Sequence, residues 1–282
     1  MRDLSGKTAV ITGAASGMGR AFANRFAKAG MNIVMSDIEE PRLDEAVEEV
    51  SAHGTGVIGQ ITDVSESASM DELGERAFAE FDSVHVVCNN AGVGGGRTGS
   101  DYVVETDWRW VIDVNLWGVI HGHRVFMPHL LERGEGHVVN TASILGHLPS
   151  HSAYVAAKWG VVGITLGLYN EMIAMDTGIG VSCLCPGWVA TDLMNSERNR
   201  PESTMPSALV EPTAEQEAAF AAVRESVQAG MPAPEVAELV HDAVVNEKFW
   251  IFTDMNMVAA LQDKHDSITE NRNPAPISIL DL

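Results

Sequence analysis

The sequence is poor in three features that would point to other classes of protein: cysteine, positive charge and long apolar runs. Only 3 cysteines occur among 282 residues, an odd number that does not make a disulfide framework. No apolar run reaches about 18 residues, so we expect no segment that spans a membrane. The first residues, M-R-D-L-S-G-K, lack the apolar core of a secretory signal. Together these absences favour a cytoplasmic protein with reduced thiols.

Positive charge is scarce, with 18 Lys and Arg against 39 Asp and Glu and a formal net charge of −21. Such a charge repels phosphates, so we expect neither nucleic acid nor an anionic membrane as a partner. Two of the cysteines, Cys183 and Cys185, point to one face of a predicted strand, which is compatible with a metal pair. No His or Cys at zinc spacing accompanies them, so we predict buried thiols, with Cys88 a third, and no metal site.

What the sequence does contain is a regular alternation of short apolar runs and helical patterns. The predicted strands cover residues 8–12, 32–37, 56–62, 84–88, 137–141, 180–184 and 250–253. Because this alternation has no linker, it predicts an α/β fold in which residues 1–282 form a single domain. The polar residues 193–230, with a helix at about 213–228, form a candidate lid over a substrate. We expect the apolar tail at about 265–282 to pack on the body or on a neighbouring subunit.

The first predicted strand leads into a glycine-rich turn, G-A-A-S-G-M-G, and then into a helix. Such a turn lets backbone N–H groups and the helix N-terminus face a pyrophosphate. The spacing G-x-x-x-G-x-G differs from the common dinucleotide fingerprint, and a glycine cluster alone also fits an ordinary tight turn. Its position between strand and helix favours a dinucleotide site. The candidate binding residues in the turn are Gly13, Ser16, Gly17, Met18 and Gly19.

The second predicted strand ends in Asp37, 24 residues after Gly13. A carboxylate at about this spacing accepts hydrogen bonds from the adenosine ribose and repels a 2′-phosphate. Ile38 and two glutamates follow it rather than Arg or Lys, and position 15 is Ala. We therefore predict NAD rather than NADP as the cofactor, with Asp37 and Ile38 at the adenosine. The alternative is that Asp37 only caps the next helix.

Further cofactor contacts are predicted where later strands end. After the third strand, Asp63 and Val64 could meet the adenine, although Asp63 or Ser65 could equally cap a helix. The fourth strand runs into N-N-A-G, whose small residues allow close approach of a cofactor. A turn at Pro186-Gly187 follows the sixth strand. The remaining predicted contacts are Asn90, Ala91, Gly92, Pro186, Gly187, Val189 and Thr191.

Tyr154, Lys158 and Ser143 form a candidate acid/base set. Tyr154 and Lys158 lie one turn apart on a predicted helix that starts near residue 152. An ammonium beside a phenol favours the phenolate. Ser143 ends the fifth strand and places its hydroxyl at the carboxyl edge of the sheet, where open α/β folds bind ligands. This set can act without a metal or a thiol.

Asn115 lies within a long helical pattern at residues 106–131. A buried Asn needs a partner, so it either bonds a neighbouring carbonyl or holds a water next to Lys158. His121, His123 and His129 lie on the same predicted helix. We interpret them as surface or interface residues rather than ligands.

In this order, the motifs resemble the short-chain dehydrogenase/reductase family, in its one-domain branch. The motifs are T-G-x-x-x-G-x-G, Asp63, N-N-A-G, Asn115, Ser143, Y-x-x-x-K and P-G, within residues 5–255. The resemblance implies a doubly wound, Rossmann-like three-layer sandwich with a seven-stranded parallel sheet, NAD(P) binding and a homo-oligomer, either a tetramer or a dimer. The sequence departs from the family pattern at residues 193–230 and in the tail.

The resemblance also implies roles for the four candidate catalytic residues. Tyr154 takes the alcohol proton, and Lys158 lowers its pKa and holds the nicotinamide ribose. Ser143 orients the carbonyl oxygen. Asn115 completes a proton relay through water.

The sequence therefore predicts an NAD-dependent oxidoreductase that interconverts a secondary alcohol and a ketone. The candidate substrate residues favour an apolar or alicyclic substrate, and two alternatives remain. One is an NADPH-dependent 3-ketoacyl-type reductase, which Asp37 opposes. The other is a non-catalytic dinucleotide sensor, which the intact acid/base set opposes. The candidate substrate-binding residues are Ser143, Ile144, Leu145, His147, Leu148, His151, Tyr154, Trp188, Leu193 and Met194.

Overall fold

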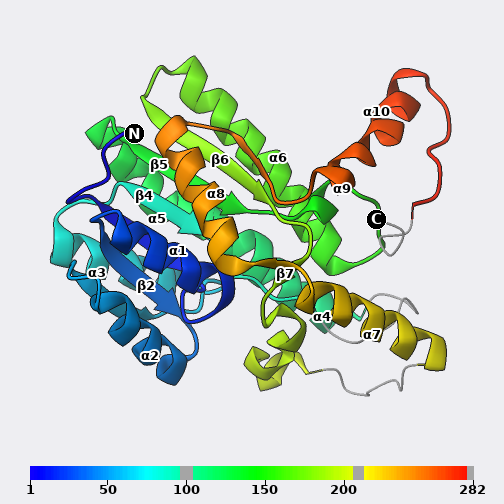
Figure 1. The fold of residues 1–282 in the computed structure, drawn as a ribbon, viewed down its shortest axis with the longest axis horizontal. Helices are drawn as coiled ribbons and strands as arrows, with labels where there is room; N and C mark the ends of the chain where they lie inside the picture. Colours follow the sequence, from blue (N-terminus) through cyan, green and yellow to red (C-terminus); the bar gives the residue numbers. More distant parts are fainter. Residues whose placement is uncertain (96–103, 206–212, 278–282) are drawn as a thin grey trace.

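A parallel sheet of seven strands lies at the centre of the molecule (Figure 1). The computed structural model describes residues 1–95, 104–205 and 213–277. The strand order is β3-β2-β1-β4-β5-β6-β9, and every neighbouring pair is parallel. This confirms the predicted doubly wound fold. The strands are β1 (Thr8–Thr12), β2 (Asn32–Asp37), β3 (Val57–Ile61), β4 (Val86–Asn89), β5 (Gly136–Thr141), β6 (Ile179–Cys185) and β9 (Trp250–Phe252).

Helices cover both faces of this sheet. On one face lie α1 (Gly17–Lys28), α2 (Glu40–Ser51) and α8 (Ala233–Asn246), and on the other lie α3 (Ser67–Phe81), α5 (Gly118–Arg133) and α6 (Ala153–Ala174) (Figure 1). The residues of β1 are apolar without alternation because helices cover this strand on both faces. Ile11 packs in the cluster that contains Phe22 of α1, whereas Val10 packs with Phe126 of α5. A strand buried on both faces needs apolar side chains in both directions.

The strand order reverses between β1 and β4, and this positions the site. In doubly wound sheets the crevice at the carboxyl ends of such strands receives the ligand. The glycine turn after β1 meets the loop after β4 at this point. Gly13 has a φ of +66°, and a Cβ there would lie 2.8 Å from the Cα of Ala91, so only glycine fits.

The predicted helix at residues 106–131 is interrupted in the structure. It consists of α4 (Glu105–Ile112), a π-helical turn (Asp113–Trp117) and then α5. A π turn carries an extra residue within a helix and is common at functional sites. Asn115 lies in this turn, and its side chain is fully buried.

The predicted helix near the end of the candidate lid is confirmed as α7 (Ala214–Gln228). Thr213 caps it, and Thr213 and Gln216 form a capping box. Two short strands not foreseen, β7 (Val189–Ala190) and β8 (Met231–Pro232), pair in parallel on either side of this segment. In the described residues between β7 and α7, 191–205 and 213, lie two 3-10 turns, at Leu193–Asn199 and Glu202–Thr204.

After β9 the chain forms α9 (Met255–Ala259) and α10 (Leu261–Thr269), which stands away from the sheet (Figure 1). The predicted packing of the tail holds for Ile277, which lies against the cluster of Ile144 and Met257. Residues 271–276 are exposed, and residues 278–282 of the tail lie outside the described part of the chain. Among the helices described, none is long and apolar enough to cross a membrane.

Candidate active site

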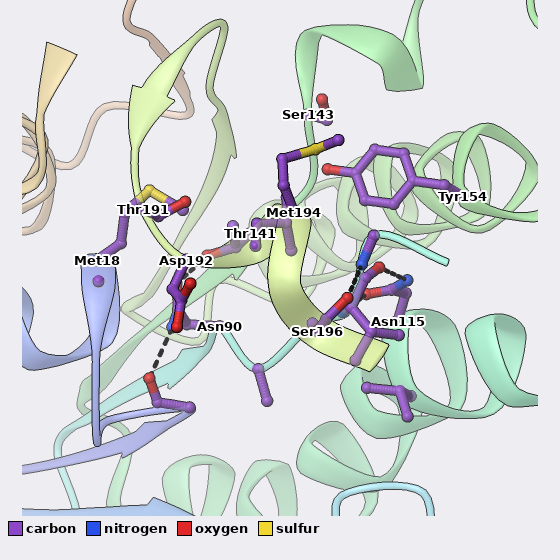
Figure 2. Close-up of a pocket in the computed structure, with 18 of the residues that line it drawn as sticks. Met18, Asn90, Asn115, Thr141, Ser143, Tyr154, Thr191, Asp192, Met194 and Ser196 are labelled. Carbon is purple, nitrogen blue, oxygen red and sulfur yellow. Dashed lines mark hydrogen bonds between the residues drawn. The ribbon is translucent and has the colours of Figure 1, made fainter. Parts of the chain in front are cut away.

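A cavity of about 450 Å³ opens at the carboxyl edge of the sheet. It brings together every cofactor residue predicted from the sequence except Gly19. Figure 2 shows Met18, Asn90 and Thr191 at one end and Ser143, Tyr154 and Met194 at the other. The predicted residues that line the cavity are Gly13, Ser16, Gly17, Met18, Asp37, Ile38, Asp63, Val64, Asn90, Ala91, Gly92, Tyr154, Lys158, Pro186, Gly187, Val189 and Thr191.

Gly19 does not line the cavity, contrary to its predicted place among the cofactor contacts. A Cβ at this position would lie 2.1 Å from the carbonyl oxygen of Gly13. Gly19 therefore allows the start of α1 to pack tightly against the turn. Its contribution that the structure shows is to the shape of the turn.

Asp37 holds the glycine turn to the end of β2. Its Oδ2 accepts a hydrogen bond from Ala15 N at 3.0 Å, and its Oδ1 accepts one from Glu39 N at 3.1 Å. It is not the cap of α2, because Glu39 occupies that position and makes no side-chain capping bond. Burial raises the pKa of Asp37, and the bonds from the two backbone N–H groups oppose that effect. The structure therefore does not support the alternative in which Asp37 only caps the next helix.

Asp63 also lines the cavity and does not cap α3. The N-cap of α3 is Glu66, whereas Asp63 Oδ1 accepts from the Ser65 hydroxyl at 2.6 Å and from Ser65 N at 2.9 Å. These bonds fix the carboxylate at the end of β3. It remains available at the cavity wall for a polar group of a ligand.

Thr12 ties β1 to β4 beneath the cavity, a role that sequence reasoning missed. Its Oγ1 accepts from the backbone N–H groups of Asn90 and Ala91 at 2.9 and 3.0 Å. Asn90 Nδ2 donates to the carbonyl oxygen of Thr12 at 3.0 Å, and the Thr141 hydroxyl donates to Asn90 Oδ1 at 3.2 Å. The T-G pair at the end of the first predicted strand is the sequence feature from which this role of Thr12 could have been predicted.

The acid/base set converges as predicted. Ser143 caps the 3-10 turn Ile144–Gly146, and its Oγ accepts from Leu145 N at 3.1 Å. Ser152 caps α6, which places Tyr154 and Lys158 on the face of this helix toward the cavity. Lys158 Nζ lies 5.6 Å from the centre of the Tyr154 ring and donates to the carbonyl oxygen of Thr141 at 2.8 Å.

The pKa values of this set differ from the sequence-based expectation. Burial raises the pKa of Tyr154, and a hydrogen bond with Ser143, rather than the charge of Lys158, opposes that effect. Burial also lowers the pKa of Lys158 to about 8. In this enclosed cavity, loss of water around the two groups outweighs their mutual attraction.

Asn115 makes the structural bonds that were one of its two predicted roles. Its Oδ1 accepts from Val93 N at 3.0 Å, and its Nδ2 donates to the carbonyl oxygen of Val93 at 2.8 Å. A Cβ on Gly92 would lie 2.7 Å from Asn115 Oδ1 and 3.7 Å from Lys158 Nζ. Asn115 thus holds the 92–94 loop beside Lys158, and its role in a proton relay stays a prediction.

The end of the cavity beside Tyr154 is lined by Ile144, Leu145, Trp188, Leu193 and Met194, all of which were predicted as substrate residues. Sequence reasoning missed the contribution of α7, whose Phe220, Val223 and Val227 also line the cavity. Their spacing puts them on one helical face, and this apolar pattern within the predicted helix was the signal. The other apolar residues that were missed include Val93, Trp110, Val114, Val155 and Met257.

Three predicted substrate residues do not line the cavity. His151 is exposed, with its ring centre 6.0 Å from that of Trp108. His147 lies beside Cys185, with Nε2 3.5 Å from Sγ, and its ring is 5.3 Å from Trp250. Leu148 is fully buried in the apolar cluster that also contains Ile144 and Met257, behind the cavity wall. Of the loop after β5, Ser150 and Ser152 line the cavity beyond Leu145, whereas these three side chains do not.

The three histidines predicted to be surface or interface residues make internal hydrogen bonds. His121 Nδ1 lies 3.0 Å from the carbonyl oxygen of Val64, and His123 Nε2 bonds to the Asn140 side chain. His129 Nε2 accepts from Val84 N at 3.2 Å. Each ring satisfies a polar group from another element, which periodicity along one helix does not reveal.

The three cysteines are free and buried, as predicted. Within the described ranges, no group of three or more His, Cys, Asp or Glu side chains has the arrangement of a metal site. Cys183 and Cys185 lie side by side, with their sulfur atoms 3.7 Å apart.

Comparisons with known proteins agree with this fold. A family model described as short chain dehydrogenase matches residues 7–202. The chain therefore belongs to the short-chain dehydrogenase/reductase family and is an oxidoreductase. A crystal structure of a short-chain dehydrogenase/reductase from Burkholderia phymatum in complex with NAD is 41% identical and covers 99% of this chain and 100% of that one, with a TM-score of 0.92.

Two curated relatives are named for alcohol oxidation. A 1-deoxy-11-beta-hydroxypentalenate dehydrogenase from Streptomyces avermitilis is 34% identical over 272 residues, or 94% of this chain and 91% of the relative. A cyclohexanol dehydrogenase from Acinetobacter is 36% identical over 190 residues, or 67% of this chain and 75% of the relative.

Proposed function

We propose that the protein is an NAD(H)-dependent oxidoreductase that interconverts a secondary alcohol and a ketone, with Tyr154 as acid/base. The observation that carries the proposal is that Ser143, Tyr154 and Lys158 line one cavity with the glycine turn and Asp37. The nicotinamide supplies the hydride chemistry at its C4 atom. The names of the two alcohol dehydrogenases above support the same reaction.

Each catalytic side chain has a defined task in this proposal. The Tyr154 hydroxyl takes the proton of the alcohol during oxidation and returns it during reduction. The Ser143 hydroxyl donates a hydrogen bond to the substrate oxygen. The Lys158 ammonium, held by the Thr141 carbonyl, faces the same region and binds ribose hydroxyls. These tasks require only the groups present in the cavity wall.

NAD is favoured over NADP by Asp37. Its carboxylate lies at the adenosine end, where it accepts from ribose hydroxyls and repels a 2′-phosphate. The NAD complex of the Burkholderia phymatum structure supports this choice.

The substrate is proposed to be apolar or alicyclic. Among the described residues that line the cavity, the cations are Lys158 and Arg198. Lys158 belongs to the acid/base set, and Arg198 is paired with Glu39 at 2.6 Å. Apart from Lys158, the described part of the cavity wall therefore presents no cation that is free to bind a phosphate. This disfavours an acyl substrate carried on a phosphorylated group.

A panel of secondary alcohols, assayed with NAD⁺ and with NADP⁺, tests this function. Cyclohexanol and bulkier bicyclic alcohols should reduce NAD⁺, whereas short polar secondary alcohols should react more slowly. Preference for NADP⁺ would overturn the choice of cofactor. Faster turnover of the short polar alcohols would overturn the proposed substrate class.

We also propose a homo-oligomer, tetramer or dimer, in a reducing cytoplasm. The free cysteines support the compartment. Support for assembly comes from α6, which is apolar all round, the pattern of a helix covered on every side. One face nevertheless exposes Trp159, Leu166 and Ile173, whose exposed fractions are 40%, 36% and 64%.

Residues 193–230 are proposed to act as a lid, because their described parts line the cavity.

A further inference from the structure

Two arginines and two acids form a network at the adenosine end of the cavity. Arg198 donates to Glu39 Oε1 at 2.6 Å and lies 3.4 Å from Asp192 Oδ2. Arg42 lies 3.1 Å from Asp192 Oδ2 and 3.5 Å from Glu39 Oε2. We call Arg42, Glu39, Arg198 and Asp192 the charge network. It joins the start of α2 to the segment that follows β7.

The charge network is part of the cavity wall and lies beside Asp37. Glu39, Asp192 and Arg198 line the cavity with Asp37, and the charges of Asp37 and Arg198 attract each other. Glu39 is the least exposed member, with 19% of its side chain accessible, against 42% for Arg42. With Asp37, three carboxylates therefore surround two guanidinium groups, which leaves this end of the cavity with a net negative charge.

The orientation of Arg198 depends on Glu39. Arg198 Nε donates to both Glu39 oxygens, at 3.1 and 3.2 Å. The guanidinium therefore meets the carboxylate along one edge, where its N–H donors lie. Asn199 Nδ2 adds a bond to Glu39 Oε1 at 2.9 Å. Glu39 is held ionised, since its hydrogen bond with Arg198 lowers its pKa. The donors that a phosphate would need are thus already used by the protein.

We propose that Glu39 is a second residue that determines cofactor specificity, by occupying Arg198 and Arg42 so that neither can bind a 2′-phosphate. The inference rests on the proposed binding of a dinucleotide at this site. Removal of Asp37 alone removes one repulsive charge but leaves both guanidinium groups paired. Removal of the charge of Glu39 as well leaves Nε and Nη2 of Arg198 free to donate in bidentate fashion to a phosphate. Nη1 keeps its bonds to the carbonyl oxygens of Asp192 and Asn195, which hold the guanidinium in place.

The experiment compares Asp37→Ser, Glu39→Gln, the double variant and a triple variant that adds Arg198→Ala. Dissociation constants for NADP⁺ and NAD⁺ are measured by calorimetry, and kcat/KM is measured with each. Asp37→Ser alone should weaken NAD⁺ binding with little gain for NADP⁺. The double variant should bind NADP⁺ at least tenfold more tightly than Asp37→Ser, and Arg198→Ala should remove that gain. Higher salt should also reduce it.

Glu40 provides the matched control, since it is an exposed glutamate one residue further along. Asp37→Ser with Glu40→Gln changes the net charge equally, so it should behave as Asp37→Ser alone does. The proposal is overturned if that control gains NADP⁺ affinity equally, if the double variant gains none, or if the gain survives Arg198→Ala. The proposed function is judged separately, on whether the wild-type protein oxidises alcohols with NAD⁺.

Discussion

At the scale of one residue, burial of the Lys158 ammonium lowers the free energy of unfolding of the protein. Its side chain is 3% exposed, and burial lowers its pKa from 10.5 to about 8. The folded protein at pH 7 therefore keeps a charge that its surroundings disfavour. By the usual conversion, this shift corresponds to roughly 3 kcal/mol.

We expect Lys158→Met to have a higher free energy of unfolding than the wild type at pH 7 while losing nearly all activity. The gain should be smaller than roughly 3 kcal/mol, because the carbonyl of Thr141 loses its donor at a cost of about 1 kcal/mol. Urea unfolding followed by fluorescence measures the change. A variant that is clearly less stable than wild type at pH 7 would contradict this account of the residue.

The same variant should show a pH dependence of defined sign. Since the folded pKa of Lys158 lies below the unfolded value, the cost is full below about pH 8 and fades as the pH rises to 10.5. The advantage of Lys158→Met should therefore shrink across that window. An advantage that is constant from pH 7 to 10 would mean that the lysine charge is not its source.

At this scale the sequence predicted residue identities better than their electrostatics. The spacing of Tyr154 and Lys158 on one helix was sufficient to place them together. The pKa of Tyr154 was expected to fall, whereas burial raises it. Burial depends on Val114, Met194 and other residues of distant elements that enclose the cavity, and local spacing contains no information about them.

At the scale of elements, α7 lines the part of the cavity that is proposed to bind the substrate. We expect Val223→Trp to raise KM for bulky alcohols by tenfold or more while leaving KM for NAD⁺ unchanged, because Val223 lines the cavity. Ala221→Trp is the control, since Ala221 is exposed on the same helix. Steady-state kinetics with a small and a bulky alcohol provide the comparison. Equal effects of the two variants would remove α7 from the substrate site.

A buried ion pair fixes the segment after β7 to α4. Arg200 pairs with Asp107, their side chains are 2% and 5% exposed, and Arg200 lies 5.1 Å from the Trp110 ring, which lines the cavity. We expect Arg200→Met to lower the free energy of unfolding by roughly 3–5 kcal/mol. Arg109→Met is the control, because its pair with Glu105 is exposed and contributes at most about 1 kcal/mol. Urea denaturation measures the free energy of unfolding of both variants. Similar losses in the two would argue against a stabilising contribution from the buried ion pair.

Elements with strong local patterns were predictable, and those defined by distant partners were not. The seven strands of the sheet are short apolar runs between turn residues, and the helix capped by Thr213 has its signal in the sequence. The two-residue strands β7 and β8 depend on pairing between Val189 and Met231, far apart in the chain. The π turn at Asn115 follows from the bonds of its side chain to Val93. The direction of His151 depends on how the loop after β5 folds back.

At the scale of the whole molecule, the uncovered face of α6 is the feature most relevant to assembly. We expect Leu166→Glu with Ile173→Glu to shift the protein toward monomers, because two charges would be placed in a proposed apolar contact. Leu239→Glu, on the outer side of α8, is the control, since Leu239 is as exposed as Leu166. Light scattering during size-exclusion chromatography gives the mass. A wild-type monomer, or a control that dissociates equally, would contradict the proposed interface.

The central claim is that the Tyr154 hydroxyl carries the proton of the reacting alcohol. Its most direct test is NADH formation in a single turnover, after the NAD⁺-loaded protein is mixed with a reactive secondary alcohol. Tyr154→Phe should slow this step by about 10²–10⁴-fold while NAD⁺ still binds. Tyr169→Phe, on the same helix but packed against Phe249, should react like the wild type. A Tyr154→Phe protein that forms NADH at the wild-type rate would contradict the account.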